Sequence, residues 1–310
     1  MISNIYKNYA FPITIGALLA LTLVGGPDYL ASRSFKEGWN IGHIILFSLF
    51  TLYILKYRQI LAGRKLIFKI IFIIFVVGIL SILIEFSQFI FKNGTPDLAD
   101  VRRNFVGAAL GFIFTIRLKN KYILAFLKVS IYLIILFELL PVSLALADEI
   151  RVIRKFPVLS DFESRLELSR WSGRASFTST IDIAFHGNKS LLINFGTTKY
   201  SGISLNYLRR DWTEYSFLKF EIYYPENDSL SFTCRIHDGS HTKGNQAYND
   251  RFNHPYVLHY GWNEISIPFN DIENAPKSRK MDMTDIRAIG IFTIRLPESK
   301  RIYLDYVRLE

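Results

Sequence analysis

The hydropathic pattern of this chain changes at Ala147–Asp148, and this change limits what the chain can fold into. Before it lie apolar runs long enough to cross a bilayer, which takes about 20 apolar residues in a helix. After it, short segments alternate between apolar and polar residues and are separated by Asn, Asp and Gly turns, a pattern typical of β-strands. We therefore expect a membrane domain at residues 1–147, a linker at 148–158 and an all-β domain at 159–310.

The composition favours a membrane protein. Of the 310 residues, 50% are hydrophobic and the mean hydropathy is +0.20, which is more apolar than an ordinary soluble protein. The net charge of +10 falls mainly in the apolar half, where basic loops orient helices, so it gives no argument for a nucleic-acid partner. We expect an α-helical membrane bundle of about five transmembrane helices, at residues 9–25, 39–56, 66–91, 105–118 and 122–147.

The charges between these helices predict an orientation. The second and fourth links are basic and contain no acid, whereas the first and third carry both signs. The basic residues are Lys56, Arg58, Arg64, Lys65 and Lys69 in the second link and Arg117, Lys119 and Lys121 in the fourth. The positive-inside rule places these two links in the cytoplasm. We therefore expect a multi-pass protein of the cytoplasmic (inner) membrane, with a cytoplasmic N-terminus and an extracytoplasmic C-terminal domain.

The end of the fifth expected helix allows two interpretations. Pro141 and the small residues Ala145 and Ala147 precede Asp148, as in a signal peptide with its cleavage site. A final helix that ends in small residues explains the same pattern without cleavage. The sequence leaves open whether the chain is cleaved after Ala147.

Polar residues within the apolar half need a reason, because a charged side chain in a bilayer costs roughly 2.5–3.5 kcal/mol on insertion scales. Ser81, Glu85 and Gln88 share one helix face. With the expected orientation, His43, Glu85, Gln88, Asp100 and Asn104 come to one depth near the external side. Such residues form an interhelical hydrogen-bond network, a site for an outer-leaflet lipid headgroup, or a catalytic site with His43 or Glu85 as general base. No nucleophile or metal-ligand spacing accompanies them, so the interhelical network is favoured first, a headgroup site second and catalysis last.

At these residues the chain resembles the VanZ-like membrane family, named after a glycopeptide (teicoplanin) resistance protein. The matching elements are His43 at the start of an apolar helix, Glu85-x-x-Gln88 and Asp100-x-x-x-Asn104-x-x-Gly107-x-x-x-Gly111. Thr95 stands where the family usually has an Arg. The resemblance implies a cell-envelope context rather than a reaction. Gly107 and Gly111 form a small-xxx-small pair, which close helix packing explains.

The second half is expected to form an all-β jelly-roll sandwich. Alternating runs occur at 190–195, 203–208, 218–224, 231–237, 263–268, 288–294 and 301–309. Cys234 is the only cysteine, so it has no internal disulfide partner. It lies in phase with Phe232 and Ile236, and we expect all three side chains to be buried.

This half resembles the galactose-binding-like group of carbohydrate-binding modules. The resemblance is carried by Asp161-Phe162-Glu163, His186-Gly187-x-x-Ser190-Leu191, Asp211-Trp212-x-x-Tyr215-x-x-Leu218, Gly261-Trp262-Asn263-x-Ile265-x-Ile267-Pro268 and Ile302-Tyr303-Leu304-Asp305-Tyr306-Val307. It implies a structural Ca²⁺ between Glu163 and Asp305, although two carboxylates fall short of the usual 6–8 ligands. Two acids at strand ends facing solvent are the alternative.

Strand parity predicts a ligand face. If Phe232 and Cys234 point inward, then Arg235 and His237 point outward, next to a loop at 238–253 that is rich in hydrogen-bonding and aromatic residues. Sugars bind through such groups. Our candidate ligand-binding residues are Arg235, His237, Asp238, Asp250, Arg251 and Tyr256. Asp–Arg and His–Asp pairs can also simply hold a loop in place, and Trp212 and Trp262 are expected to serve packing.

These observations predict an envelope membrane protein that presents an external β-sandwich to a surface glycan or glycolipid. Membrane lipid and that glycan are the expected partners. The alternative is a membrane enzyme acting on an outer-leaflet lipid-linked cell-wall precursor, and a third possibility is an assembly scaffold.

Overall fold

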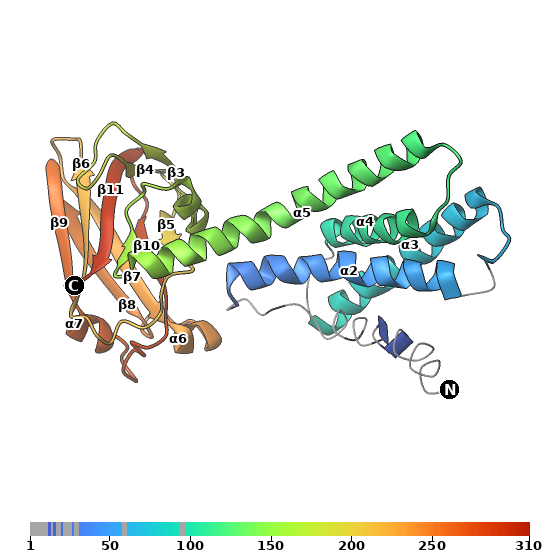
Figure 1. The fold of residues 1–310 in the computed structure, drawn as a ribbon. Coiled ribbons are helices and arrows are strands. Elements are labelled where there is room, and N and C mark those ends of the chain that lie inside the picture. Colours follow the sequence, from blue (N-terminus) through green and yellow to red (C-terminus); the bar gives the residue numbers. More distant parts are fainter. Residues whose placement is uncertain are drawn as a thin grey trace. The chain divides into compact units, whose positions relative to one another are not determined.

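The computed structural model describes residues 12–13, 15–16, 20, 27, 31–57, 61–92 and 97–310. Contacts between Cα atoms divide the chain into two compact units, Met1–Leu146 and Ala147–Glu310 (Figure 1). The division lies one residue from the boundary expected after residue 147.

The first unit is helical. It contains α2 (Arg33–Tyr57), α3 (Leu66–Lys92), α4 (Leu98–Thr115) and most of α5 (Lys121–Lys155). In the described part of the chain, α2, α3 and α5 are long and apolar enough to cross a membrane. Helix α4 starts seven residues earlier than expected and so includes Asp100, Arg102 and Arg103 in its 18 residues. Five spanning helices are therefore not confirmed, and the first expected helix, 9–25, lies largely outside the described residues.

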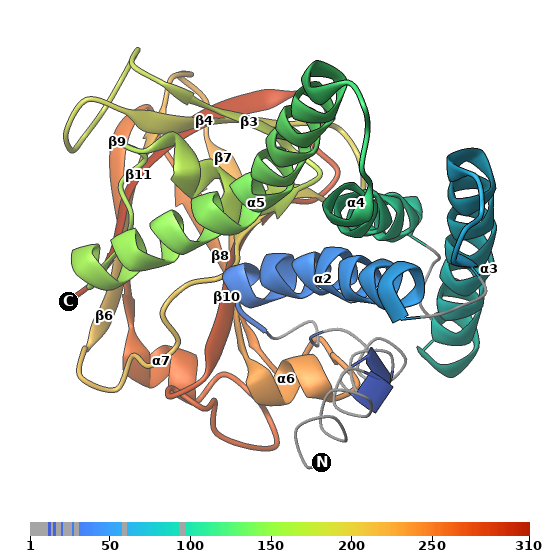
Figure 2. The ribbon, with the colours of Figure 1, turned by 45° about the vertical axis from the view of Figure 1, so that its right-hand side comes forward.

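Helices α2 and α4 lie side by side in both views (Figures 1 and 2). Two glycines on α4 explain how closely they approach. A Cβ atom added to Gly107 would overlap the Ile44 carbonyl oxygen, and one added to Gly111 would overlap that of Ser48. The small-xxx-small pair thus packs against α2, as predicted.

Helix α5 continues beyond the expected end at residue 147. The segment 148–155 contains no glycine or proline, so nothing in it stops the helix before Phe156 and the cis Pro157. The expected linker at 148–158 is therefore helix up to Lys155, and β1 begins at Val158. The position Ala147–Asp148 lies inside α5.

The second unit contains two antiparallel sheets. One has the strand order β3-β4-β11-β6-β9, with β1 paired to β11, and the other has the order β2-β5-β10-β7-β8. The strands are β1 (Val158–Ser160), β2 (Trp171–Gly173), β3 (Ser176–Thr180), β4 (Ser190–Phe195), β5 (Ser201–Leu205), β6 (Phe217–Tyr224), β7 (Leu230–Asp238), β8 (Phe252–Leu258), β9 (Gly261–Pro268), β10 (Ile286–Thr293) and β11 (Lys300–Leu309). Short helices η2 (Arg165–Arg170), α6 (Gly239–Lys243) and α7 (Phe269–Glu273) connect them. From β4 to β11 the chain alternates between the sheets except at β7–β8, a sandwich of the expected kind.

One hydrophobic core fills the sandwich between residues 159 and 309. Phe232, Cys234 and Ile236 are each at most 1% exposed, which confirms the predicted parity of β7. Burial raises the pKa of the Cys234 thiol to about 12. Trp212 is fully buried and stacks on Phe269, so its predicted packing role is confirmed.

Candidate functional site

A groove of about 510 Å³ lies on the outer face of the five-stranded sheet. We call it the sheet groove. It is lined by Gly173, Arg174, Tyr200, Gly202, Ile203, Ser204, Thr233, Arg235, Tyr248, Arg251, Phe292 and Ile294. Register explains why distant residues meet there, because Arg235 on β7 is paired with Gly290 on β10, which is paired with Ser204 on β5. Residues opposite one another on neighbouring strands project to the same face.

Small residues make the floor of the sheet groove. A Cβ atom on Gly290 would stand 3.2 Å from Nε of Arg235, and one on Gly202 would overlap the Phe292 side chain. The walls are aromatic, since Tyr200 is 47% and Tyr248 is 65% exposed. The two glycines thus leave room for the Phe292 and Arg235 side chains that line the groove, and the exposed rings stand at its rim.

Three arginines and no acidic residue line the sheet groove. The Nη2 of Arg235 donates to Ser204 Oγ at 3.1 Å. The guanidinium of Arg251 lies 5.7 Å from the ring centre of Tyr248. Burial lowers the pKa of Arg251, and its Nε is buried without a hydrogen-bond partner among the described residues. The structure thus places two of the predicted ligand residues, Arg235 and Arg251, in one groove.

Asp238 and Asp250 do not line this groove. Both accept hydrogen bonds from Arg279, with Asp238 at 2.5 and 2.8 Å and Asp250 at 2.6 and 3.1 Å. Although burial opposes ionisation, the bonds from Arg279 hold the pKa of Asp238 below its usual value. This geometry is that of the alternative interpretation, in which acidic residues hold a loop in place. Nothing in the sequence near Asp238 indicated Arg279, which lies 41 residues away.

His237 and Tyr256 also lie outside the sheet groove. Burial lowers the pKa of His237 to about 4, and its ring lies 5.1 Å from that of His241. Tyr256 lies on β8 and lines a second hollow of about 690 Å³, to which Tyr248 and Arg251 also contribute. The loop expected at 238–253 is in fact helix α6 followed by a turn, and β8 begins at Phe252.

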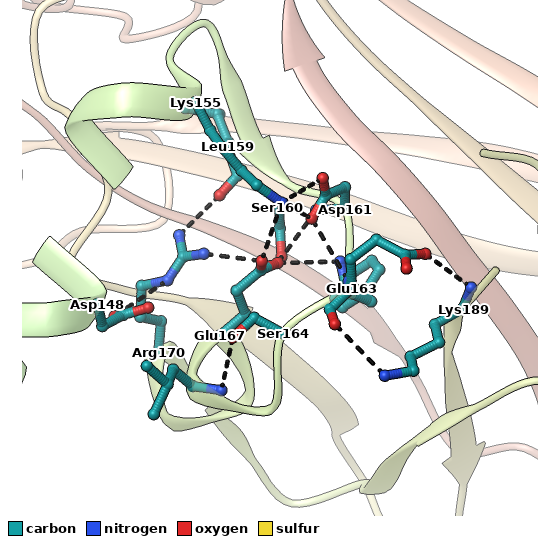
Figure 3. Close-up of polar contacts among 12 residues, drawn as sticks. Asp148, Lys155, Leu159, Ser160, Asp161, Glu163, Ser164, Glu167, Arg170 and Lys189 are labelled. Atoms are coloured by element: carbon teal, nitrogen blue, oxygen red, sulfur yellow. Dashed lines mark hydrogen bonds and ion pairs between the residues drawn. The ribbon is translucent and has the colours of Figure 1, made fainter. Parts of the chain in front are cut away.

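The two predicted metal ligands hold one loop from two sides. Glu163 Oε1 accepts from the backbone N–H groups of Asn188 and Lys189 at 2.7 and 2.8 Å, and Glu163 lies beside Lys189 in Figure 3. Asp305 Oδ2 accepts from the N–H groups of Phe185 and His186 at 2.7 and 2.9 Å. Burial raises the pKa of Asp305.

This arrangement does not fit a Ca²⁺ site. Backbone N–H groups point at the oxygens that a cation would need, and Asp305 Oδ1 also accepts from the N–H of Tyr306 at 2.7 Å. In the part of the chain that the structure describes, no three His, Cys, Asp or Glu residues are placed to hold a metal. These two carboxylates instead hold the backbone of residues 185–189 and of Tyr306 in place.

A buried ionic cluster joins the last turns of α5 to the β-sandwich (Figure 3). Arg170 is 3% exposed and lies 3.4 Å from Asp148 and 3.7 Å from Glu167, while Lys155 contacts Asp161 at 2.6 Å. Burial raises the pKa of Glu167, and the negative charge of Asp161 raises it further. Although burial opposes it, the hydrogen bond from Lys155 lowers the pKa of Asp161. This cluster holds the helix end on the domain.

The helical unit brings several of its predicted polar residues together. His43 Nδ1 lies 2.9 Å from Asn104 Oδ1, and Asn104 Nδ2 donates to Ser81 Oγ at 2.9 Å. The other ring nitrogen of His43 lies 3.5 Å from Asp100. Helices α2, α3 and α4 are thus joined by buried side-chain contacts of the kind expected for interhelical packing.

The remaining predicted residues lie at the edge of this cluster. Glu85 accepts from the N–H of Asp97, the N-cap of α4, at 2.8 Å, and Gln88 is half-buried further along α3. Glu138 on α5 pairs with Arg102 at 2.6 Å and with Arg103 at 3.3 Å.

The fold and these clusters define a class of protein, a helical membrane unit followed by a β-sandwich with an open groove. The family model described as VanZ/LLP1 matches residues 5–120, which confirms the predicted resemblance of the first half. No curated protein matches the chain.

Several solved structures are similar to the C-terminal half. A Family 11 carbohydrate-binding module from Clostridium thermocellum, in complex with a β-1,3-1,4-mixed-linked tetrasaccharide, is 18% identical over 49% of this chain and 93% of the module, with a TM-score of 0.37. An exo-β-agarase is 17% identical over 49% of this chain and 24% of that protein, with a TM-score of 0.39. The CBM22-1–GH10 modules of the xylanase 10B from Clostridium thermocellum are 14% identical over 49% of this chain and 28% of that protein, with a TM-score of 0.34.

Proposed function

We propose that this is an integral membrane protein of the cell envelope whose β-sandwich binds a surface glycan or glycolipid in the sheet groove. The observation that carries the proposal is the combination of exposed rings and fixed donors on one concave face. Tyr200 and Tyr248 offer ring faces for the C–H groups of a sugar, and Arg235 offers paired N–H donors for its oxygens. A hollow of about 510 Å³ falls within the range of ordinary ligand sites.

The orientation of the protein is part of the proposal. The basic segments around residues 56–69 and 117–121 favour a cytoplasmic position for those links. If α4 and the segment 9–25 also cross the membrane, as this proposal requires, the N-terminus is cytoplasmic and Ala147–Glu310 faces the extracytoplasmic space of an inner membrane. A reporter fused after Glu310 that is active only in the cytoplasm would refute this orientation.

A glycan array tests the binding function. The fragment Ala147–Glu310 is suitable, because its core lies wholly between residues 159 and 309. We expect binding to at least one polysaccharide, and we expect Tyr200→Ala to weaken it about tenfold or more, as losing a stacking ring does. Tyr260→Ala is the matched control, since Tyr260 is 61% exposed but follows β8 outside the groove. Absence of binding to every glycan would refute the proposal.

An enzymatic function is a second candidate, favoured by the surroundings of His43. Its ring lies between Asp100 and Asn104, and such contacts orient an imidazole for proton transfer. The substrate would be an outer-leaflet lipid-linked cell-wall precursor. His43→Ala and Glu85→Gln should then abolish tolerance to a glycopeptide antibiotic, whereas Ser87→Ala, which removes only a hydroxyl bonded to its own helix, should not. Full tolerance in both variants would exclude this candidate.

A further inference from the structure

We infer that the sheet groove recognises an acidic glycan, a sugar chain that carries carboxylate or phosphate groups. The inference rests on the proposed glycan-binding function and specifies its ligand class. It comes from the charge of the groove, where Arg174, Arg235 and Arg251 contribute three guanidinium groups and no lining residue is acidic.

The side chain of Arg251 gives the strongest indication that the ligand is anionic. Its Nε is buried and makes no hydrogen bond within the described residues, and no ion pair there joins it to a carboxylate. Burial lowers its pKa, opposed only by the neighbouring rings of Tyr248 and Tyr200. A desolvated charge without a counter-charge is unfavourable, and an anionic ligand would supply the missing partner.

Other buried or half-buried arginines of the same domain have carboxylate partners, which Arg251 lacks among the described residues. Arg170 lies among Asp148 and Glu167, Arg279 between Asp238 and Asp250, and Arg308 against Glu221 and Glu310. Within the described residues, Arg251 has no such carboxylate partner. A guanidinium without a carboxylate partner from the protein is what a site for an external anion requires.

Arg235 and Arg174 extend this positive surface. Ser204 accepts a hydrogen bond from Arg235, whose guanidinium lies over Gly290, so the group is held in place before a ligand arrives. Arg174 is exposed after the end of β2, and no ion pair in the described parts of the chain involves its side chain. Planar guanidinium groups match the paired oxygens of carboxylate and phosphate groups, and the charge on those oxygens makes the hydrogen bonds stronger than those to the hydroxyl groups of a neutral sugar.

Matched polymers test the inference on the full-length chain in zwitterionic lipid nanodiscs. The probes are polygalacturonate, its fully methyl-esterified form and poly(glycerol phosphate). Esterification removes the charge and keeps the sugar chain, and the phosphate polymer separates the two sources of negative charge. We expect polygalacturonate or the phosphate polymer to bind at least about tenfold more tightly than the ester, with affinity falling as salt rises.

Three variants assign the effect to the groove. Arg251→Gln and Arg174→Gln should each weaken binding of the anionic polymer about tenfold, in line with the loss of a charged hydrogen bond. Arg301→Gln is the control, because Arg301 is exposed on β11 of the other sheet. Tyr200→Ala should weaken binding whatever the charge of the polymer.

The outcomes separate this inference from the function on which it rests. Equal binding of polygalacturonate and its ester, lost in Tyr200→Ala, would overturn the acidic ligand class and keep glycan binding in the groove. Anionic binding that is unchanged in Arg251→Gln and Arg174→Gln would overturn the assignment to the groove. Binding of none of the three polymers would overturn the acidic ligand class, and the glycan array with neutral polysaccharides would then decide the binding function separately.

Discussion

Replacing Arg170 by Met tests the ionic cluster that holds the end of α5 on the β-sandwich. Arg170, Asp148 and Glu167 are 3%, 2% and 1% exposed, so the substitution removes a buried positive charge from beside two buried carboxylates, of which Glu167 keeps Lys155 at 3.7 Å. The Nη1 of Arg170 also donates to the carbonyl oxygen of Leu159 at 2.6 Å, and that acceptor loses its partner. Both losses raise the free energy of the folded state and leave that of the unfolded chain unchanged.

The expected destabilisation is about 3–5 kcal/mol, the usual cost of removing one member of a buried ion pair. This is a large part of the 5–15 kcal/mol that stabilises a typical domain. The cost should also depend on pH. The charge of Arg170 lowers the pKa of Glu167, so without it the folded-state pKa of Glu167 rises further above the value of about 4.3 in an unfolded chain. A raised folded pKa favours folding at low pH and loses that contribution as pH rises. The loss of stability should therefore be greater at pH 8 than at pH 5.

Urea unfolding of Ala147–Glu310, followed by tryptophan fluorescence, measures this effect at the two pH values. Trp171 reports on the cluster directly, because its Nε1 donates to Ser160 Oγ at 3.3 Å. Arg165→Met is the control, since Arg165 is exposed at the start of the same helix and should change stability by less than about 0.5 kcal/mol. A loss below about 1 kcal/mol for Arg170→Met, or an equal loss at both pH values, would refute this reasoning.

Three further predictions follow from contacts elsewhere in the molecule. Arg279→Met should destabilise the domain by about 3–5 kcal/mol in urea unfolding, because Asp238 is fully buried and loses its cation; a neutral effect would contradict the bonds seen here. Adding EDTA should leave the unfolding midpoint unchanged while Asp305→Ala lowers it, and a midpoint that falls with EDTA would show that Ca²⁺ binds after all. Gly107→Val should reduce the thermal stability of the full chain in detergent, because its side chain would overlap α2, whereas Gly42→Ala meets no atom within 4 Å and should be tolerated.

The sequence predicted β7 closely because burial alternates strictly along that strand. On β7, every second residue from Leu230 to Asp238 is buried, and the expected run at 231–237 differs from the strand by one residue at each end. Strand β8 was missed because it lies at the edge of its sheet and contains Pro255, so both its composition and its exposed pattern are typical of a loop.

The candidate sites were predicted only in part, because they bring together residues that are far apart in the sequence. The alternation of side chains along β7 placed Arg235 on the outer face of that strand, but the groove also includes Gly202 on β5 and Phe292 on β10, which the pattern of one strand does not indicate. Partners far apart in sequence, such as Asp238 and Arg279, cannot be inferred from local spacing. Asp100 and Arg103 do have helical spacing, a signal that could have drawn attention to the arginines that pair with Glu138.

The enclosure of Cys234 makes the native chain a convenient starting point for mapping its passage through the bilayer. A thiol with a pKa near 12 has only ~10⁻⁵ of its population as the reactive thiolate at neutral pH, and no other cysteine is present. A cysteine introduced at Ser32 or Asn120 would thus take up nearly all of an impermeant maleimide that reaches it. Labelling of intact cells at one of these positions and not the other would show which loop faces outward, with the rest of the sequence left as it is.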